Sequence, residues 1–318
     1  MAFITKSPFL DNRDGALLRF LADSRFAPGA IFFVNSSSNN DGDAPGCGQT
    51  PDQPFSTIDY AIGVCTTNKG DLIIVMPGHT ETITAANGID MDVAGVTILG
   101  LGQGTLKPTV TFSTATTTTL RMNAANCRLE GIRCVSGIDS LVKFIDVNAN
   151  YCTIANCDFD GPSTLEFLSG INIATTVGDF TTIEDCLFTQ GADPTGTDAA
   201  ADTGCIYLVD SENVTIRRTR FFGNFETACI HNKTTGAAHL WIEDCRGYCS
   251  LSGSEPMLLV STATGSMVRS YFVTPAETAV TEATLSGTFP ATFFNMDSYF
   301  GNDGAGGQTG IRSTADAS

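Results

Sequence analysis

Two Glu-Asp pairs with nearly identical surroundings are the residues best suited to acid–base chemistry. Glu184-Asp185 follows Thr-Thr-Ile, Glu243-Asp244 follows Leu-Trp-Ile, and a Cys comes directly after each pair. Arg217-Arg218 occupies the matching place in a segment between them, after Val-Thr-Ile. Two carboxyl groups roughly 5–9 Å apart can cleave a glycosidic bond. Opposite charges on neighbouring strands can equally form a salt ladder that only stabilises the fold.

One residue of each pair is expected to face outward, because adjacent residues of a strand point to opposite faces. Glu184, Arg217 and Glu243 would then form an outward acid–base–acid column. We interpret this column as a salt ladder and predict no catalytic residue. The alternative is a glycosidase carboxylate pair, for which these three residues are the candidates.

The residues that could hold a metal ion lack the spacing of metal sites. An Asn/Asp-rich stretch offers oxygen ligands for Ca²⁺ but has neither the alternation nor the distal Glu of an EF-hand loop, so turn chemistry is expected. The three histidines share no metal-ligand spacing. We therefore predict no metal and no cofactor. The residues concerned are Asn39, Asn40, Asp41, Asp43, His79, His231 and His239.

Two further motifs also have structural explanations. Residues 100–104, GLGQG, lack the Lys and the following helix of a phosphate loop, so we expect a turn. Trp241 and Tyr248 could together stack against a sugar, but packing beneath a loop is the commoner role of such side chains.

The acidic pairs belong to a short line that the chain repeats. An apolar anchor is followed three positions later by Cys, Thr or an apolar residue. In the clearest copies, Phe159, Phe188 and Phe221 come five positions after the anchor. Successive anchors lie 25–33 residues apart, and they are Ile98, Leu129, Ile154, Ile183, Ile216, Ile242 and Val268.

Strand-only repeats of unequal length indicate a parallel β-helix, in which each repeat is one coil. No repeat contains the helix of a βαβ crossover. Stacked coils would bury ladders of like residues, so we expect Cys157 to lie over Cys186 and Phe159 over Phe188. A β-sandwich or up-and-down barrel is the alternative, but it would need short hairpins and leaves the repeat unexplained.

Composition limits the partners of the protein. There are 34 acidic and 17 basic residues, a net charge of −17, which argues against binding nucleic acid or an anionic membrane surface. No run approaches the ~20 apolar residues of a membrane span, so no membrane insertion is expected. The N-terminal apolar run is too short for a signal peptide, and synthesis in a cytoplasm is expected.

The eleven cysteines are odd in number and lie mostly inside strand-like runs. We expect them to be buried thiols that behave as small apolar side chains. Cys47 and Cys65 flank a loop segment and are the pair that could form a disulfide.

The ends of the chain do not follow the repeat, so we divide it into an arm or cap (1–29), a β-helix (30–300) and a flexible tail (301–318). Residues 11–26 can form a short amphipathic helix that begins at Asp14. This helix could plug the open end of the coil stack. It could instead be an arm that binds a partner. The partner-binding residues predicted for the arm are Lys6, Arg13, Leu17, Leu18, Arg19, Leu21 and Arg25.

Residues 32–62 and 70–83 resemble the opening of the pectate-lyase-like β-helix superfamily. The shared pattern is an Asn/Asp/Gly loop, a Pro-Phe-x-Thr-Ile-x-x-Ala helix starting at Pro54, a Gly-Asp-x-Ile strand from Gly70, and the turn Pro77-Gly78. The resemblance implies a right-handed, single-stranded, all-β parallel β-helix with a short N-terminal helical or arm segment. It implies nothing about activity, because enzymes, adhesins and phage appendages share this fold.

The acidic, Thr- and Gly-rich body also resembles β-helical proteins of tailed phages, and that resemblance implies a homotrimer. We expect a noncatalytic bacteriophage protein on the exterior of the virion, a capsid decoration or head-fibre subunit. Residues 1–29 would anchor it to the major capsid protein or another virion protein. The alternatives are a tail fibre or tailspike with polysaccharide lyase or glycoside hydrolase activity, and an adhesin for host surface glycans.

Overall fold

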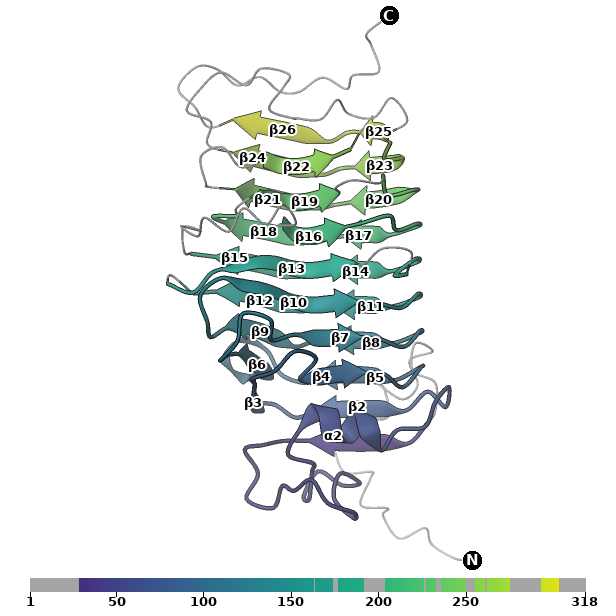
Figure 1. The fold of residues 1–318 in the computed structure, drawn as a ribbon, viewed down its shortest axis with the longest axis vertical. Coiled ribbons are helices and arrows are strands. Elements are labelled where there is room, and N and C mark those ends of the chain that lie inside the picture. The colour runs from purple at the N-terminus through teal and green to yellow at the C-terminus, as the bar shows by residue number, and fades with distance from the viewer. Residues whose placement is uncertain are drawn as a thin grey trace, which may run out of the picture.

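Three long sheets make up the body of the molecule, and each full coil of the chain adds one strand to each sheet in turn (Figure 1). A computed structural model describes residues 29–162, 164–173, 177–191, 204–225, 227–232, 236–249, 255–260, 262–274 and 293–302. In these ranges every paired strand is parallel to its neighbours. The strands nearest the viewer in Figure 1 run to the right as the chain climbs, which is the right-handed sense.

The predicted all-β parallel β-helix is therefore confirmed. The sandwich and barrel alternatives are wrong, because their hairpins would pair neighbouring strands antiparallel. Within the described residues each sheet holds strands from many coils: ten in sheet 1, nine in sheet 2 and seven in sheet 3.

The strands follow the order sheet 1, sheet 2, sheet 3 within a coil. Sheet 1 contains β1 (Ile31–Val34), β2 (Leu72–Val75), β5 (Thr97–Gly100), β8 (Arg128–Glu130), β11 (Thr153–Ala155), β14 (Thr182–Glu184), β17 (Thr215–Arg217), β20 (Leu240–Glu243), β23 (Gly265–Val268) and β25 (Phe293–Met296). Sheet 2 contains β3 (Thr80–Ile83), β6 (Thr109–Phe112), β9 (Arg133–Ser136), β12 (Asp158–Gly161), β15 (Leu187–Gln190), β18 (Arg220–Gly223), β21 (Arg246–Cys249), β24 (Tyr271–Thr274) and β26 (Tyr299–Asn302). Sheet 3 contains β4 (Ile89–Met91), β7 (Leu120–Met122), β10 (Leu141–Val147), β13 (Phe167–Ile173), β16 (Gly204–Leu208), β19 (Ala228–Asn232) and β22 (Glu255–Leu259).

Residues with positive φ set the corners on both sides of sheet 1. The corner before the strand has φ between 55° and 80° at Gly95, Asn126, Tyr151, Phe180, Asn213 and His239. The corner after the strand has φ between 45° and 75° at Gly131, Asn156, Asp185, Arg218, Asp244, Arg269 and Asp297. Gly, Asn and Asp tolerate this left-handed backbone best, which explains their place in the repeated line.

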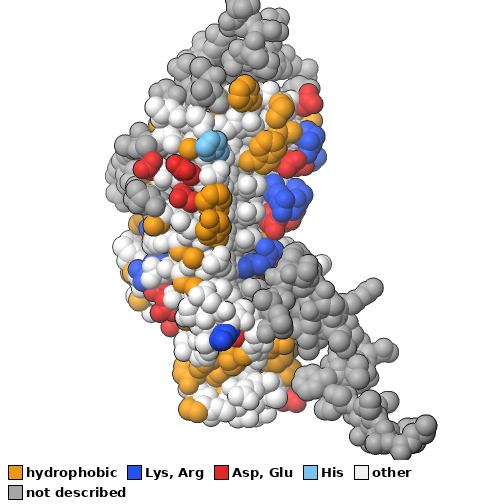
Figure 2. Space-filling model, turned by 90° about the vertical axis from the view of Figure 1, so that its right-hand side faces the viewer, with side chains coloured by type: hydrophobic (Ala, Val, Ile, Leu, Met, Phe, Trp, Pro, Cys, Tyr) orange, Lys and Arg blue, Asp and Glu red, His pale blue; other side chains and the backbone are white. Residues whose placement is uncertain are grey.

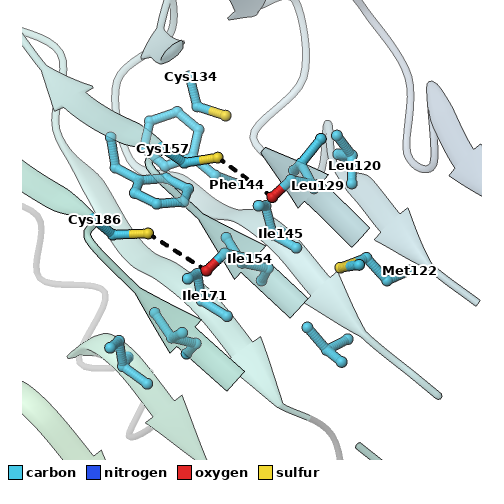
Figure 3. Close-up of a cluster of buried hydrophobic side chains, with 14 of the residues drawn as sticks. Leu120, Met122, Leu129, Cys134, Phe144, Ile145, Ile154, Cys157, Ile171 and Cys186 are labelled. Carbon is cyan, nitrogen blue, oxygen red and sulfur yellow. Dashed lines mark hydrogen bonds between the residues drawn. The ribbon is translucent and has the colours of Figure 1, made fainter. Parts of the chain in front are cut away.

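A buried Cys, Thr or Ser follows the second corner in most coils. Cys157 Sγ donates to the carbonyl oxygen of Ala155 at 3.3 Å, and Cys186 Sγ donates to that of Glu184 at 3.3 Å. Both thiols also reach a carbonyl oxygen of the preceding coil (Figure 3). Burial raises the pKa of Cys157 to about 11, so this thiol keeps its proton and remains a donor. The Cys of the repeated line thus makes the corner compact and supplies a hydrogen bond.

The predicted Phe ladder lies inside sheet 2. Phe159 and Phe188 stack with ring centroids 4.5 Å apart and an interplanar angle of 9°. Phe221 stacks on Phe188 at 5.1 Å. The prediction that Phe159 lies over Phe188 is confirmed by their register. The prediction that Cys157 lies over Cys186 is also confirmed (Figure 3). These ladders fill the interior of the coil.

The last predicted anchor was off by one residue. Met267, not Val268, pairs with Ile242 and is buried, whereas Val268 pairs with Glu243 on the outer face. The buried residue three positions after the true anchor is Ser270, and the Phe column continues at Phe272. Both candidates are apolar, and Arg269 at the corner carries no Gly, Asn or Asp signal to fix the frame.

A short helix, α2 (Ile58–Gly63), closes the N-terminal end of the interior. Thr57 caps this helix by accepting a hydrogen bond from the backbone N–H of Tyr60. Ile58, Ala61 and Ile62 are buried in the main core together with Phe55. Figure 1 shows α2 below β4, where a further strand of sheet 3 would stand. The helix expected from the Pro-Phe-x-Thr-Ile-x-x-Ala pattern is therefore present.

All eleven cysteines are free, so the possible disulfide between Cys47 and Cys65 is absent. The seven residues predicted to bind a partner, from Lys6 to Arg25, lie outside the described residues, as does most of the tail. The proposed division into arm, body and tail stays a prediction.

Candidate functional site

The predicted acid–base–acid column exists on the outer face of sheet 1. Glu184 on β14 is in register with Arg217 on β17, which is in register with Glu243 on β20. The strand residues between the anchors and the corners point outward, because the anchors Ile183, Ile216 and Ile242 point into the core. The register therefore brings these three side chains together as the sequence predicted.

Glu184 is the centre of an ion-pair network. Its Oε2 accepts hydrogen bonds from Arg217 Nε at 2.8 Å and Arg217 Nη2 at 2.6 Å, and from Arg218 Nη2 at 3.1 Å. Arg128 Nη2, two coils back, donates to Oε1 at 3.3 Å. Burial alone would raise the pKa of Glu184, but the hydrogen bonds and charges of Arg217 and Arg128 outweigh it and lower the pKa.

A second column of alternating charge runs along the adjacent corner. Arg218 binds Asp185 through Nε and Nη2 at 2.8 and 2.7 Å, and Arg269 binds Asp244 at 2.9 and 3.0 Å. The hydrogen bond from Arg218 is the largest influence on the pKa of Asp185, which is lowered. Figure 2 shows blue and red side chains alternating up this side of the molecule.

This arrangement suits stabilisation better than acid catalysis. A glycosidase needs one carboxyl group that is protonated near neutral pH, and such a group has a raised pKa. The arginines instead hold Glu184 and Asp185 ionised. Glu184 and Glu243 are also two coils apart, about 9.6 Å at the usual strand spacing, with Arg217 between them.

The outer face of sheet 2 has a different character. One outward column runs through Leu187, Arg220, Arg246 and Tyr271. A parallel column two residues further along each strand runs through Thr189, Phe222, Tyr248 and Val273. This face of β15, β18, β21 and β24 is called the arginine–aromatic face below.

An open hollow of about 560 Å³ lies on the arginine–aromatic face. Phe222 is 61% exposed and stacks on Tyr248 with ring centroids 5.4 Å apart and an interplanar angle of 23°. Arg220 and Arg246 are exposed beside these rings and form no ion pair with a described residue. The hollow is lined by Leu187, Arg220, Phe221, Phe222, Arg246, Gly247, Tyr248, Tyr271 and Val273.

Sequence analysis missed this face, although the repeat contains it. Arg220 and Arg246 stand four positions after their anchors, Ile216 and Ile242. The aromatic residues stand six positions after the same anchors. Because every second strand residue faces outward, these two positions could have been compared from coil to coil.

Trp241 and Tyr248 do not form the shared platform that we considered. Trp241 lies on sheet 1, where its Nε1 donates to Glu243 at 3.3 Å. Tyr248 lies on sheet 2 and stacks on Phe222 instead. Neither is buried beneath a loop, since Trp241 is 39% exposed and Tyr248 is half-buried in the open hollow.

The polar loop and the histidines have structural contacts in the part of the chain that the structure describes. Asp43 accepts hydrogen bonds from the backbone N–H of Ser56 at 2.9 Å and from Thr57 Oγ1 at 2.8 Å, at the start of α2. His79 is fully buried, and its Nδ1 accepts from the N–H of Ser36 at 3.0 Å. No group of three metal-binding side chains is present among the described residues.

The remaining motifs are also placed. His231 is buried with its ring 5.2 Å from that of Tyr207, and His239 is a corner residue. Residues 100–104 run from the last residue of β5 through a short loop to the first residue of the single turn η2 (Gly104–Leu106), as expected for a turn. No described helix combines the length and hydropathy that a bilayer crossing requires.

Comparison with known proteins finds similar structures but no similar sequence. The chain matches no known protein family, and no characterised protein is similar to it in sequence. Its structure is similar to the crystal structure of pectate lyase Pel9A, with a TM-score of 0.46 and 12% identity over 87% of this chain and 78% of that one. It is also similar to the ORF18 protein of Geobacillus virus E2, with a TM-score of 0.36 and 10% identity over 88% of this chain and 63% of that one.

The sheet 1 column changes character toward the N-terminal end. The positions equivalent to Glu184 are Phe33 on β1, Ile74 on β2 and Leu99 on β5. With Leu72 they form a second apolar cluster on the outside of the sheet, separate from the interior core. Charged residues begin at Glu130, the next position in the same column. The first coils therefore carry buried apolar side chains on the outer side of sheet 1, where the later coils carry charged ones.

Proposed function

We propose that this protein is a noncatalytic structural subunit on the exterior of a bacteriophage virion, a capsid decoration or head-fibre protein attached through residues 1–29. A stack of coils is a stiff rod, because each coil is hydrogen-bonded to its neighbours along three sheets. A rod held at one end is suited to project from a particle surface.

The closed N-terminal end of the core is the observation that carries the proposal. We considered two roles for the first segment, a plug for the coil stack or an arm for a partner. α2 and Phe55 already fill the plug position, with Ile58 and Ala61 at 1% and 0% exposure. This occupied plug position favours the arm as the role of residues 1–29. Their net charge of +1, from four basic and three acidic residues, is complementary to an acidic partner surface.

Gly29 and Ala30 mark where the body begins. The N–H of Gly29 donates to the carbonyl oxygen of Gly70 at 3.1 Å, and the N–H of Ala30 donates to Asp71 Oδ1 at 2.7 Å. A chain that starts at Gly29 would keep both bonds and all three sheets. This makes the attachment segment removable without cutting into the described fold.

Deleting residues 1–28 is therefore expected to abolish binding to phage particles that lack this protein, while the circular dichroism spectrum and cooperative unfolding persist. A matched variant, Leu17→Asp with Leu21→Asp, should also lose binding if these residues contact the partner. Full binding by the truncated chain would refute the anchor. Aggregation of the truncated chain would instead show that the segment covers the apolar outer cluster around Ile74.

The homotrimer is part of the same proposal. Light scattering of the full chain in solution tests this part of the proposal. The molar mass should be three times that of the 33.5 kDa subunit. A monomer at micromolar concentration would count against side-by-side packing of three rods.

A further inference from the structure

We propose that the arginine–aromatic face binds an acidic carbohydrate chain, one that carries carboxylate groups on its sugar rings. This binding site is distinct from the attachment segment, because it lies on sheet 2 of the later coils. It would give the projecting rod a ligand of its own.

Arg220 and Arg246 differ from the other described arginines in having no carboxylate partner among the described residues. Six other arginines that the structure describes each have a carboxylate partner, and these are Arg121, Arg128, Arg133, Arg217, Arg218 and Arg269. Arg220 and Arg246 have none within the described ranges. In a protein with twice as many acids as bases, two neighbouring arginines without acids form an exceptional site.

The register of sheet 2 places these two like charges side by side. Arg220 pairs directly with Arg246 on the adjacent strand, about 4.8 Å away by the usual strand spacing. Like charges placed directly opposite each other destabilise a sheet. A bound anion would remove this repulsion, since a guanidinium group binds a carboxylate through two parallel hydrogen bonds. The pair therefore offers a site for an anion that the described residues do not supply.

The aromatic column selects the class of ligand. Phe222 and Tyr248 present a stacked pair of rings two residues after the arginines along each strand, and both line the same open hollow. Flat apolar rings accept the C–H face of a sugar, and the Tyr hydroxyl supplies a polar contact. One ring and one guanidinium group on each of two successive coils fit a linear chain whose units each offer a flat face and a carboxylate.

Nucleic acid shares the stacking and the negative charge but fits less well. It carries a phosphate for every base, and such a dense polyanion is repelled by a protein of net charge −17. An acidic sugar chain has sparser charge and can lie in a hollow that has only two arginines. Single-stranded DNA is accordingly the main competing ligand in the test.

The test measures binding of the full-length protein to oligogalacturonate, alginate and hyaluronan oligomers, with dextran as the neutral chain and oligo-dT as the nucleic acid. We expect calorimetric binding to at least one acidic oligosaccharide and at least tenfold weaker binding to dextran and oligo-dT. Arg246→Gln and Tyr248→Ala should each weaken the binding at least tenfold.

Two controls match these changes elsewhere on the molecule. Phe180→Ala removes one ring of the exposed Tyr151–Phe180 stack, whose centroids are 4.8 Å apart on a corner of the coil. Arg133→Gln removes an arginine of sheet 2 that is paired with Asp160. Both variants should bind like the wild type.

Four results would overturn the proposal. They are no binding to any acidic oligosaccharide, equal binding of oligo-dT, binding that survives Tyr248→Ala, and a change of oligomeric state in Arg246→Gln or Tyr248→Ala. The last result would mean that this face packs against a second copy of the chain. Because none of these measurements involves particles, their outcome is independent of the attachment experiment.

Discussion

Sheet 1 and sheet 2 use arginine in opposite ways although they share one interior and one register. On sheet 1 the coils alternate acid and base, so Arg217 and Arg218 are bound to Glu184 and Asp185. On sheet 2 two arginines follow each other without an acid. The fold determines only which residues lie next to each other on neighbouring coils. The charge of the residue one coil away decides whether an arginine stabilises the protein or is left available for a ligand.

The largest effect is expected from Glu184→Gln. This change leaves the guanidinium groups of Arg128, Arg217 and Arg218 facing a neutral amide at a nearly buried position, so the free energy of unfolding should fall by about 2–3 kcal/mol. Urea denaturation followed by circular dichroism gives the value.

Glu243→Gln is the matched control for this change, because Glu243 is 29% exposed and has one arginine partner, Arg269. It should cost less than about 1 kcal/mol. Equal losses for the two variants would show that Glu184 is no more than an ordinary surface ion pair.

The second-largest effect is a loss of stability in acid, which should arise from the carboxylates beside sheet 1 and not from the arginines of sheet 2. The lowered pKa values of Glu184 and Asp185 mean that both carboxylates stabilise the folded state above their unfolded pKa values, near 4.5 and 3.8. That stability is lost as the pH falls below those values toward the lower folded pKa values. The free energy of unfolding should therefore fall between about pH 5 and pH 3.

Variants on the two sheets should differ in how steeply their stability falls with pH. Glu184→Gln should show a shallower fall than the wild type, because one of the carboxylates is gone. Arg246→Gln should keep the wild-type slope, since no carboxylate of the described chain is paired with Arg246. Identical slopes for wild type and Glu184→Gln, from urea titrations at a series of pH values, would contradict the role of the network.

The sequence predicted the parts of the fold that depend on repetition. Cys157 over Cys186 and Phe159 over Phe188 followed from equal offsets after an apolar anchor, because stacked coils bury like residues together. The frame was lost at Val268, where two apolar residues adjoin and the corner residue is an arginine. The register of a repeat can be predicted reliably only where Gly, Asn or Asp identifies the corner.

The candidate sites were predicted less completely, because they depend on how far side chains reach. The column of Glu184, Arg217 and Glu243 follows from register alone. The contact of Arg128 with Glu184 does not, since it crosses a whole coil over the small side chain of Ala155. The arginine–aromatic face could be deduced only by comparing outward positions on sheet 2, whereas the motif search followed acidic residues.

The smallest effect belongs to the unpaired arginines. Replacing Arg246 with Gln removes a like charge opposite Arg220 and breaks no described ion pair, so the unfolding free energy should rise by up to about 0.5 kcal/mol. The gain should shrink in 1 M NaCl, where the Debye length of about 3 Å screens the repulsion. Arg133→Gln on the same sheet should show no gain at either salt concentration, because it loses its bond to Asp160. A loss of stability in Arg246→Gln at low salt would mean that this arginine has a partner in the fold, and the contrast between the two sheets would then fail.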